Sequence, residues 1–390
     1  MKQRAAIVAM AQTRFEPKKG GERFQEMVWE VVKQVREETG LGFNKPGQEK
    51  PGHIDNAVTC SDDFMDARTI SDACIGDLVG AHYGSEEKVA QDGLQALLYA
   101  AACVLSGHSE ITIVAGHCKE SQSASRNRIS SAAFDPIFQR QIGMDYLNAC
   151  ALQARAYMGR TGATEEQCAL AVARDRQHAS MNPNAQRRIP ISAEEVMSSP
   201  YLCDPLKELD VYPVSDGAIA AIVTTEERAR RLTDKPIYIN GAGNCYNAFY
   251  LGDRDLSDDE ALREAAAKAY TMAGVQDPAR EFDLVEIAAQ ASYQELLWLE
   301  CLGLVPDGKA GAYIQSGKTD LGGELPVNVS GGMISGTPIL LGGMARATEC
   351  FLQLRGITGR RQIDGAKLAL AQGSTGPAAQ HHSVMVLSAE

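Results

Sequence analysis

The chain has 390 residues, of which 44% are hydrophobic and 23% are charged, and its formal net charge at pH 7 is −12. This length allows two or more domain-sized units, and the acidic balance argues against nucleic acid as a partner, since nucleic acid requires a basic surface. No apolar run approaches the roughly 20 residues that cross a bilayer, so we expect no membrane association. The ten cysteines form no C-x-x-C pair. We therefore expect reduced thiols, no metal site and, without a recognisable signal peptide, a cytoplasmic protein.

The first part of the chain alternates apolar runs with amphipathic segments. RAAIVAMAQT at 4–13 has the continuous apolar character of a buried strand. A helix is predicted at 21–40, where apolar residues share one face and Gly40 supplies a stop. The expected order continues with a strand at 54–62, helices at 69–81 and 91–107, and a strand at 110–117.

The last part of the chain repeats this order. Strands are predicted at 236–244, 282–290, 367–371 and 383–388, with a strand and turn at PVNVSGG. Helices are predicted at 257–274, 292–302 and about 340–355. Alternating strands and helices indicate an α/β layered fold, and the repetition indicates two such units packed together.

The segment 121–205 differs in composition, because it is rich in Arg, Ser, Asn and Pro, and we interpret it as an inserted loop domain with helices at 145–160 and 165–181. Residues 206–232 resume the strand-and-helix pattern. The expected organisation is a first half at 1–120 plus 206–235, the loop domain at 121–205, and a second half at 236–390. A short surface loop is expected at 44–52.

Three long segments resemble the sterol-carrier-protein-type branch of the thiolase superfamily. They are YMGRTGATEEQCALAVARDRQHASMNPNAQRR, VYPVSDGAIAAIVTTEERARRL and SYQELLWLECLGLVPDGKAGAYIQSGKTDLGGELPVNVSGG. The resemblance implies the thiolase fold, a duplicated α-β-α-β-α core of five layers with an inserted loop domain. It also implies a dimer that handles acyl-CoA, with coenzyme A as co-substrate and no covalently bound cofactor.

Shorter segments are similar to the thiolase-like subunits of benzoylsuccinyl-CoA thiolases, which act in anaerobic toluene degradation. These segments are AQTRFEPKKG, VTCSDD, EEKVAQDG and GHCKES. This resemblance implies cleavage of 2-benzoylsuccinyl-CoA by CoA to benzoyl-CoA and succinyl-CoA. It also implies a small partner subunit with a zinc finger and an OB domain, bound to a homodimer of the thiolase chain within a heterotetramer.

The family's first catalytic loop carries a cysteine nucleophile just before a helix. In KVAQDGLQAL the resemblance places Ala90 at that position, followed by Gln91 and Asp92. Alanine has no nucleophile, so Ala90 contributes only backbone and space. Gln91 is a candidate contact to the substrate. Asp92 is a candidate base if burial raises its pKa, although an acidic residue in a first helical turn also simply favours the helix dipole.

The second and third loops depart from the family in the same way. The family's Asn-Glu or His-Asp box becomes Ala288–Ala289–Gln290, and Gly-His-Pro becomes Gly336–Thr337–Pro338. Thr337 can only donate or accept a hydrogen bond, and the backbone at Gly336 is a candidate to line an oxyanion. Gln290 and Ser292 are candidate ligand contacts, but Ser292 also suits the start of a helix.

Five further residues are candidate contacts to substrate or CoA. Gly373 and Ser374 belong to AQGSTG, which replaces the family's fourth loop, and Asn328 lies in the PVNVSGG turn. Arg126 and Arg128 lie in the loop domain, where family members bind the CoA tail. Either arginine could meet a phosphate or carboxylate, or could lie in a solvated surface.

His117 is the best remaining acid–base group by side-chain chemistry, although a histidine within a strand is also commonly a core residue. The absence of several catalytic side chains leaves three hypotheses. The first is thiolytic cleavage of a β-keto acyl-CoA in which CoA attacks directly, without an acyl-cysteine. The second is a retro-aldolase on the same fold. Known members of that group have tyrosines in the second and third loops, and the presence of Ala288 and Thr337 there counts against this hypothesis. The third is a non-catalytic scaffold subunit.

Overall fold

The computed structural model describes residues 4–44, 53–82 and 84–390, so the surface loop expected at 44–52 lies almost wholly outside the described residues. Five first-half strands pair in the order β3-β2-β4-β7-β1, and four second-half strands continue as β8-β11-β10-β9. The first-half strands are β1 (Ala5–Gln12), β2 (Asn56–Cys60), β3 (Ser85–Lys88), β4 (Ile111–Lys119) and β7 (Asp216–Thr225). The second-half strands are β8 (Ile237–Tyr246), β9 (Leu284–Ile287), β10 (Leu368–Thr375) and β11 (His381–Ser388).

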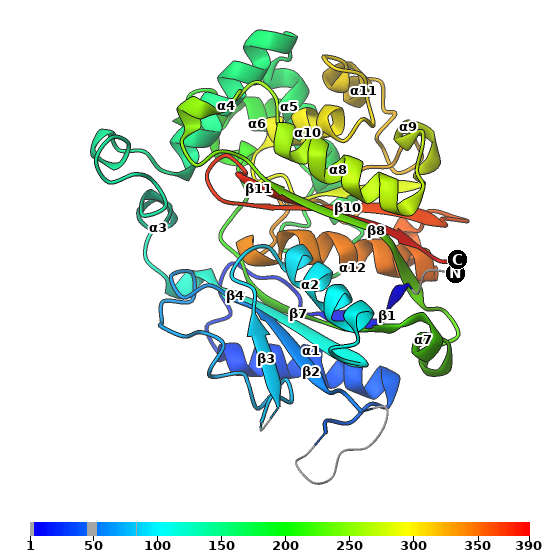
Figure 1. Ribbon diagram of the computed structural model, residues 1–390. Helices are drawn as coiled ribbons and strands as arrows, with labels where there is room; N and C mark the ends of the chain where they lie inside the picture. Colours follow the sequence, from blue (N-terminus) through cyan, green and yellow to red (C-terminus); the bar gives the residue numbers. More distant parts are fainter. Residues whose placement is uncertain (1–3, 45–52, 83) are drawn as a thin grey trace.

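The two sets of strands lie above and below a central helical layer (Figure 1). A short antiparallel pairing of Ala5–Ile7 with Ile237–Ile239 joins them at one edge. The central layer consists of α2 (Gly93–Ser106) and α12 (Gly342–Arg355), which pack on each other and on strands of both halves. The outer layers are α1 (Phe24–Thr39) below and α8 (Glu260–Ala273) with α10 (Ser292–Cys301) above. The five α-β-α-β-α layers of the thiolase fold are therefore confirmed.

The sequence of α2, GLQALLYAAACVLS, explains its central position. The helix is apolar on most of its circumference, which is typical of a helix covered on both sides rather than on one. It begins after Asp92, whose side chain accepts a hydrogen bond from the N–H of Leu94, and ends at Gly107 in the left-handed conformation. The cap and the terminal glycine fix the ends of a helix that hydrophobic burial holds in place.

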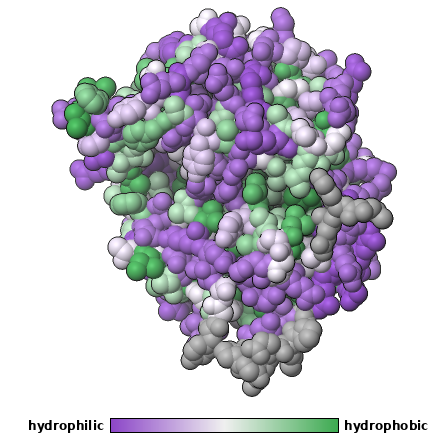
Figure 2. Space-filling view, viewed as in Figure 1, coloured by the Kyte–Doolittle hydropathy of each residue, from purple (hydrophilic) through white to green (hydrophobic). Residues whose placement is uncertain are grey.

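The chain between β4 and β7, which includes the expected loop domain at 121–205, carries four α-helices and two short strands. These are α3 (Arg126–Ser131), α4 (Tyr146–Thr161), α5 (Glu165–Ala179), α6 (Ala193–Ser198), β5 (Tyr201–Cys203) and β6 (Leu206–Lys207). Beside α3 an arm projects from the body at the left of Figure 1, and Figure 2 shows apolar residues gathered at its tip. Ile137, Phe138 and Ile142 are the exposed apolar residues of this arm.

Most predicted elements are confirmed within a few residues, but several differ or were not expected. The helix expected at 69–81 is a series of turns, and PVNVSGG contributes one bridge, Val285 to Val327, instead of a strand. The edge strand β3 was not expected, because its sequence, SEEK, has no apolar residue. The smaller helices α7 (Glu226–Leu232), α9 (Pro278–Glu281) and α11 (Ala310–Gln315) complete the chain. Among the described helices, none combines the length and apolar character that crossing a bilayer requires.

Candidate active site

A cavity of about 330 Å³ opens at the N-terminal end of α2. Its wall is mainly apolar and aromatic, with contributions from both halves and from the loop domain: Phe64, Met65, Phe134, Tyr146, Leu340 and Pro377. Ala90, Arg126 and Gln290, which lie far apart in the sequence, all line it. The structure therefore brings together three of the residues that the sequence singled out. A concave, largely apolar site with a few polar groups is typical of a small-molecule binding site.

Ala90 lies exposed in this cavity, two residues before the N-cap of α2. The N-terminal end of a helix favours negative charge, because its first N–H groups lack partners within the helix. No cysteine, histidine or lysine belongs to the described residues that line the cavity. Gln91 turns away, and its side-chain amide donates to the hydroxyl of Tyr246.

Cys60, at the end of β2, is a thiol that contacts the loops at Gln91 and Leu340. Its Sγ lies 3.7 Å from the carbonyl oxygen of Gln91 and 3.7 Å from that of Leu340. Burial, with a further contribution from the charge of Asp92, raises the pKa of this thiol well above its ordinary value. Cys60 is fully buried and therefore remains a neutral thiol at physiological pH.

Arg126 reaches the cavity from α3 but is already paired. Its Nε and Nη2 donate to the two carboxylate oxygens of Glu120 at 2.6 and 2.8 Å. Its Nη1 donates to the carbonyl of Tyr212 at 2.8 Å, and the guanidinium lies 3.8 Å from the centre of the Tyr212 ring. Arg128 is exposed on the same short helix and does not line the cavity.

Gln290 and Ser292 are near each other in sequence but differ in environment. Gln290 lines the cavity, and its backbone carbonyl accepts the N–H of Tyr212 at 3.0 Å. Ser292 is the first residue of α10, and its hydroxyl donates to the carboxylate of Asp210 at 2.7 Å. The side chain of Ser292 thus neither reaches the cavity nor caps its helix.

Asp92 lies behind the cavity wall, where three segments meet. Its Oδ1 accepts from the N–H of Leu94 and its Oδ2 from the N–H of Gly343, each at 2.8 Å. Burial, the larger effect, raises the pKa of Asp92 to about 7, although these N–H groups favour the charged form. A Cβ on Gly373 would lie 2.1 Å from Asp92 Oδ1, so this glycine permits the close approach of β10.

His117 lies on the other face of β4. Neighbouring strand residues alternate between faces: Val114 and Cys118 belong to the core around α2, whereas Ala115 belongs to the core under α1. His117 shares the α1 side, stacks on Phe24 with ring centroids 5.0 Å apart, and lies 3.3 Å from Asp66. The structure does not bring His117 to the cavity, because β4 directs it into the opposite layer.

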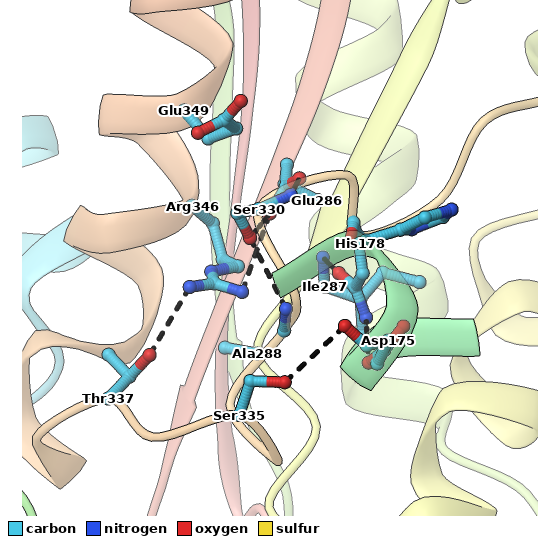
Figure 3. Close-up of polar contacts among 12 residues, drawn as sticks. Asp175, His178, Glu286, Ile287, Ala288, Ser330, Ser335, Thr337, Arg346 and Glu349 are labelled. Carbon is cyan, nitrogen blue, oxygen red and sulfur yellow. Dashed lines mark hydrogen bonds and ion pairs between the residues drawn. The ribbon is translucent and has the colours of Figure 1, made fainter. Parts of the chain in front are cut away.

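Thr337 belongs to a buried charged network instead of the large cavity (Figure 3). Its hydroxyl accepts from Nη2 of Arg346 at 3.3 Å, and Arg346 Nη1 lies 3.4 Å from Glu286. Ser330 donates to Glu286 through both its backbone N–H and its hydroxyl, at 2.9 and 2.6 Å. Burial raises the pKa of Glu286 to about 7. Gly336 and Thr337 line a gap of about 10 Å³ beside Arg346, room for one water molecule.

Asn328, Gly373 and Ser374 serve the framework around the site. The Asn328 amide donates to Asp175 at 3.2 Å and to Glu295 at 2.9 Å, while its oxygen accepts from the N–H of Ile287 at 2.7 Å. Ser374 lies 3.5 Å from the carbonyl of Ala288. The side chains of Asn328 and Ser374 are buried and hold the second and fourth loops together.

Sequence reasoning missed Asp62, Tyr146 and Tyr212, which also line the cavity. Asp62 follows β2, and its Oδ1 accepts from the N–H groups of Phe64 and Met65 at 2.8 and 3.0 Å. Ligands of α/β sheets bind at the carboxyl ends of strands, so the position of Asp62 at the end of a predicted strand was a usable signal. The two tyrosines carried no such signal, because only the folding of the chain between β4 and β7 brings them here.

The family model described as "Thiolase C-terminal domain-like" matches residues 243–389. The acetyl-CoA acetyltransferase of Methanothermobacter thermautotrophicus is 32% identical over 97% of this chain and 98% of its own length. The chain belongs to the thiolase superfamily. Matches to sterol carrier protein 2, for example 37% identity over 50% of this chain for the rabbit (Oryctolagus cuniculus) protein, place it on the sterol-carrier-protein branch.

Two further thiolase-superfamily relatives bear on the site. The benzoylsuccinyl-CoA thiolase subunit BbsB of Thauera aromatica is 34% identical over 53% of this chain and 53% of its own length. The solved structure of the Ltp2-ChsH2(DUF35) aldolase superposes with a TM-score of 0.83 at 25% identity, covering 99% of this chain and 98% of that one. The first is named a subunit, and the second name joins Ltp2 with ChsH2.

Proposed function

We propose that this thiolase-family chain cleaves a β-keto acyl-CoA with coenzyme A, and that the CoA thiol attacks the ketone directly. The observation that carries this proposal is Ala90, which lies in the cavity at the N-terminal end of α2, the position that the resemblance assigns to the cysteine nucleophile. The acetyl-CoA acetyltransferase relative, which spans nearly the whole chain, supports acyl transfer. A missing nucleophile removes the covalent intermediate but leaves the overall reaction possible, since CoA carries its own thiol.

The reaction balances without a further reactant. The CoA sulfur bonds to the ketone carbon, the bond between that carbon and the α-carbon breaks, and its electron pair goes to the α-carbon. The thiol loses one proton and the α-carbon gains one, so the protons balance and the products are two acyl-CoA molecules. Both the alkoxide and the enolate that form on the way are anions, which the N-terminal end of α2 favours.

We assign the proton transfer to Asp62. Among the described residues that line the cavity, Asp62 is the one with a carboxylate. Its Oδ1 accepts hydrogen bonds from two backbone N–H groups. Asp92 and His117, the acid–base candidates from the sequence, do not line the cavity. A positioned carboxylate within reach of the thiol is the first requirement of general base catalysis.

One finer candidate substrate is 2-benzoylsuccinyl-CoA, which would give benzoyl-CoA and succinyl-CoA. The BbsB match and the aromatic wall of the cavity support it. A small zinc-finger/OB-domain subunit, bound to a homodimer of this chain within a heterotetramer, is the matching partner. Its support is that BbsB is named a subunit and that the aldolase structure pairs Ltp2 with ChsH2.

A retro-aldolase is the second candidate, because the Ltp2-ChsH2(DUF35) aldolase superposes over nearly the whole chain. The two reactions differ in their need for CoA. Thiolysis consumes free CoA and yields two thioesters, whereas retro-aldol cleavage of a β-hydroxy thioester yields one thioester and a free carbonyl compound. A scaffold subunit would do neither.

The decisive assay incubates the full chain, alone and with its co-purified small subunit, with 2-benzoylsuccinyl-CoA or benzoylacetyl-CoA, with and without CoA. The expected result is CoA-dependent formation of two acyl-CoA products and no acylated protein by intact-mass spectrometry during turnover. A Cys60→Ala variant should retain this activity. An acyl adduct on any cysteine contradicts direct attack. A parallel incubation with the matching β-hydroxy acyl-CoA tests the aldolase, which would release a free carbonyl compound without CoA. No cleavage of either kind of thioester in either preparation supports the scaffold.

A further inference from the structure

We propose that Glu120 sets the charge preference of the cavity, an inference that rests on the proposed function. Glu120 neutralises Arg126, so the site selects an uncharged acyl group over one that carries a free carboxylate. The preferred substrate class is therefore a neutral β-keto acyl-CoA with an apolar or aromatic acyl group. 2-Benzoylsuccinyl-CoA, which carries a free carboxylate, should accordingly be a poorer substrate than a neutral analogue.

The pair of Glu120 and Arg126 is closed and buried. Both guanidinium donors, Nε and Nη2, meet both carboxylate oxygens at 2.6 and 2.8 Å, which is the bidentate geometry of a strong ion pair. The side chains are only 2% and 9% exposed. Burial lowers the pKa of Arg126, but Tyr212 and Glu120 outweigh it and raise that pKa above its ordinary value, so the guanidinium stays charged beside the Glu120 carboxylate.

The remaining contacts of Arg126 fix it in this role. Its Nη1 donates to the carbonyl of Tyr212, so three of the five N–H groups of an arginine are committed. The guanidinium also lies over the Tyr212 ring at 3.8 Å, while Tyr212 stands edge-on to Tyr146 with ring centroids 6.3 Å apart. Turning Arg126 towards a ligand carboxylate would break the ion pair, the backbone contact and the ring contact together.

The other described residues that line the cavity carry no compensating positive charge. Asp62 and Arg126 are the charged residues among the described residues that line the cavity. Glu120 cancels Arg126, so the local balance is set by Asp62 and is negative. A carboxylate on the acyl group would lose its hydration and meet a like charge, whereas a methyl or phenyl group would pack against Phe134, Leu340 and Tyr146.

Binding of product-like thioesters tests this charge preference without requiring turnover. Butyryl-CoA and succinyl-CoA have acyl chains of four carbons and differ by a terminal methyl or carboxylate. Titration calorimetry of the full chain should give a dissociation constant for butyryl-CoA lower by about tenfold or more, the scale of one absent charge pair. A titration with CoA alone measures how much the coenzyme A moiety, which both thioesters share, contributes to binding. Equal affinities, tighter succinyl-CoA binding, or no binding of either thioester would overturn the proposal.

Glu120→Gln supplies the matched variant. It retains the size of the side chain and one acceptor for Arg126 but restores a free positive charge, so the preference for butyryl-CoA should fall several-fold. In Glu120→Gln/Arg126→Gln no charge is released, and the wild-type preference should persist. Glu227→Gln, which removes an exposed ion pair with Arg231 on α7, is the surface control. If Glu120→Gln keeps the wild-type preference for butyryl-CoA over succinyl-CoA, the proposal is wrong.

The same variants separate this inference from the proposed function. In the cleavage assay, wild type should favour benzoylacetyl-CoA over 2-benzoylsuccinyl-CoA, and Glu120→Gln should reduce that ratio of kcat/KM. If no β-keto thioester is cleaved but the binding preference and its loss in Glu120→Gln are observed, the proposed function fails and the charge preference stands. Cleavage with a preference for 2-benzoylsuccinyl-CoA upholds the function and overturns the charge preference.

Discussion

The carboxylate of Asp92 binds the N–H of Gly343 across the centre of the molecule, at 2.8 Å. Its other oxygen binds the N–H of Leu94 in the helix that Asp92 caps. One buried side chain therefore closes the N-terminal ends of both central helices, α2 and α12, where each helix dipole favours negative charge. Because Ala90 lies just before this junction, Asp92 fixes the wall of the cavity without entering it.

Replacing Asp92 should be costlier than removing an ordinary cap. Asp92→Ala loses the α2 cap and leaves a second buried N–H, that of Gly343, without an acceptor, so we expect the free energy of unfolding to fall by about 2–4 kcal/mol. Denaturant unfolding measures this. Thr164→Ala removes a cap with one such bond, in α5, and should cost about 1 kcal/mol. Equal losses in the two variants would show that the Gly343 contact contributes nothing.

The raised pKa of Asp92 predicts a pH dependence of stability. The pKa is about 7 in the folded protein against 3.8 for a free carboxyl, so the folded state holds this proton more tightly than the unfolded chain does. Unfolding then releases a proton between these values, and the contribution of Asp92 to the free energy of unfolding falls as pH rises from about 4 to about 7. It is constant above that window.

Asp92→Asn isolates this contribution, because asparagine does not titrate. Unfolding curves of both proteins between pH 4 and 8 should show that the advantage of wild type over the variant declines up to about pH 7 and then levels off. Parallel curves throughout would mean that burial of Asp92 is not coupled to its protonation.

Two glycines should resist substitution because of the same carboxylate. A Cβ on Gly343 would lie 2.2 Å from Asp92 Oδ1, and one on Gly373 would lie 2.1 Å from the same atom. We expect Gly343→Ala and Gly373→Ala to lower the free energy of unfolding by about 2 kcal/mol or more, as overpacking does. Gly159→Ala in α4 meets no neighbour within 4 Å and should stabilise by about 0.5–1 kcal/mol. Thermal or denaturant unfolding of the three variants provides the comparison.

The pair of Arg346 and Glu286 predicts a strong non-additivity. Arg346→Met leaves the buried Glu286 carboxylate without its positive partner, and the free energy of unfolding should fall by about 3–5 kcal/mol. Adding Glu286→Gln removes the unpaired charge and should recover part of that loss. A double-mutant cycle on unfolding free energies measures the coupling. Additive losses would place the role of Arg346 in packing or in its contact with Thr337.

Ala90→Cys tests the position of Ala90 directly. A thiol at the N-terminal end of α2 should have a lowered pKa and react with iodoacetamide at neutral pH. The reaction is measured in a Cys74→Ser background, since Cys74 is exposed. Peptide mass mapping should find the label at residue 90, whereas Cys60, buried with a raised pKa, should stay unlabelled. Labelling of Cys60 but not of residue 90 would contradict the site described above.

The sequence by itself determined the layered α/β fold and the helix that becomes α2. Periodicity of apolar residues is local, so it reports which segments are strands or helices, whereas the central place of α2 came from the structure. The family resemblance also led to Ala90, Arg126 and Gln290, which the fold brings into one cavity.

Only the tertiary structure decided which of the candidate groups face that cavity. A shift of one residue along β4 reverses the layer that a side chain enters, and the strand's packing directs His117 towards α1. Likewise, the charge of Arg126 was visible in the sequence, but its neutralisation by Glu120 depends on how α3 folds back on the end of β4. Side-chain direction and ion pairing arise from long-range packing, which no local pattern encodes.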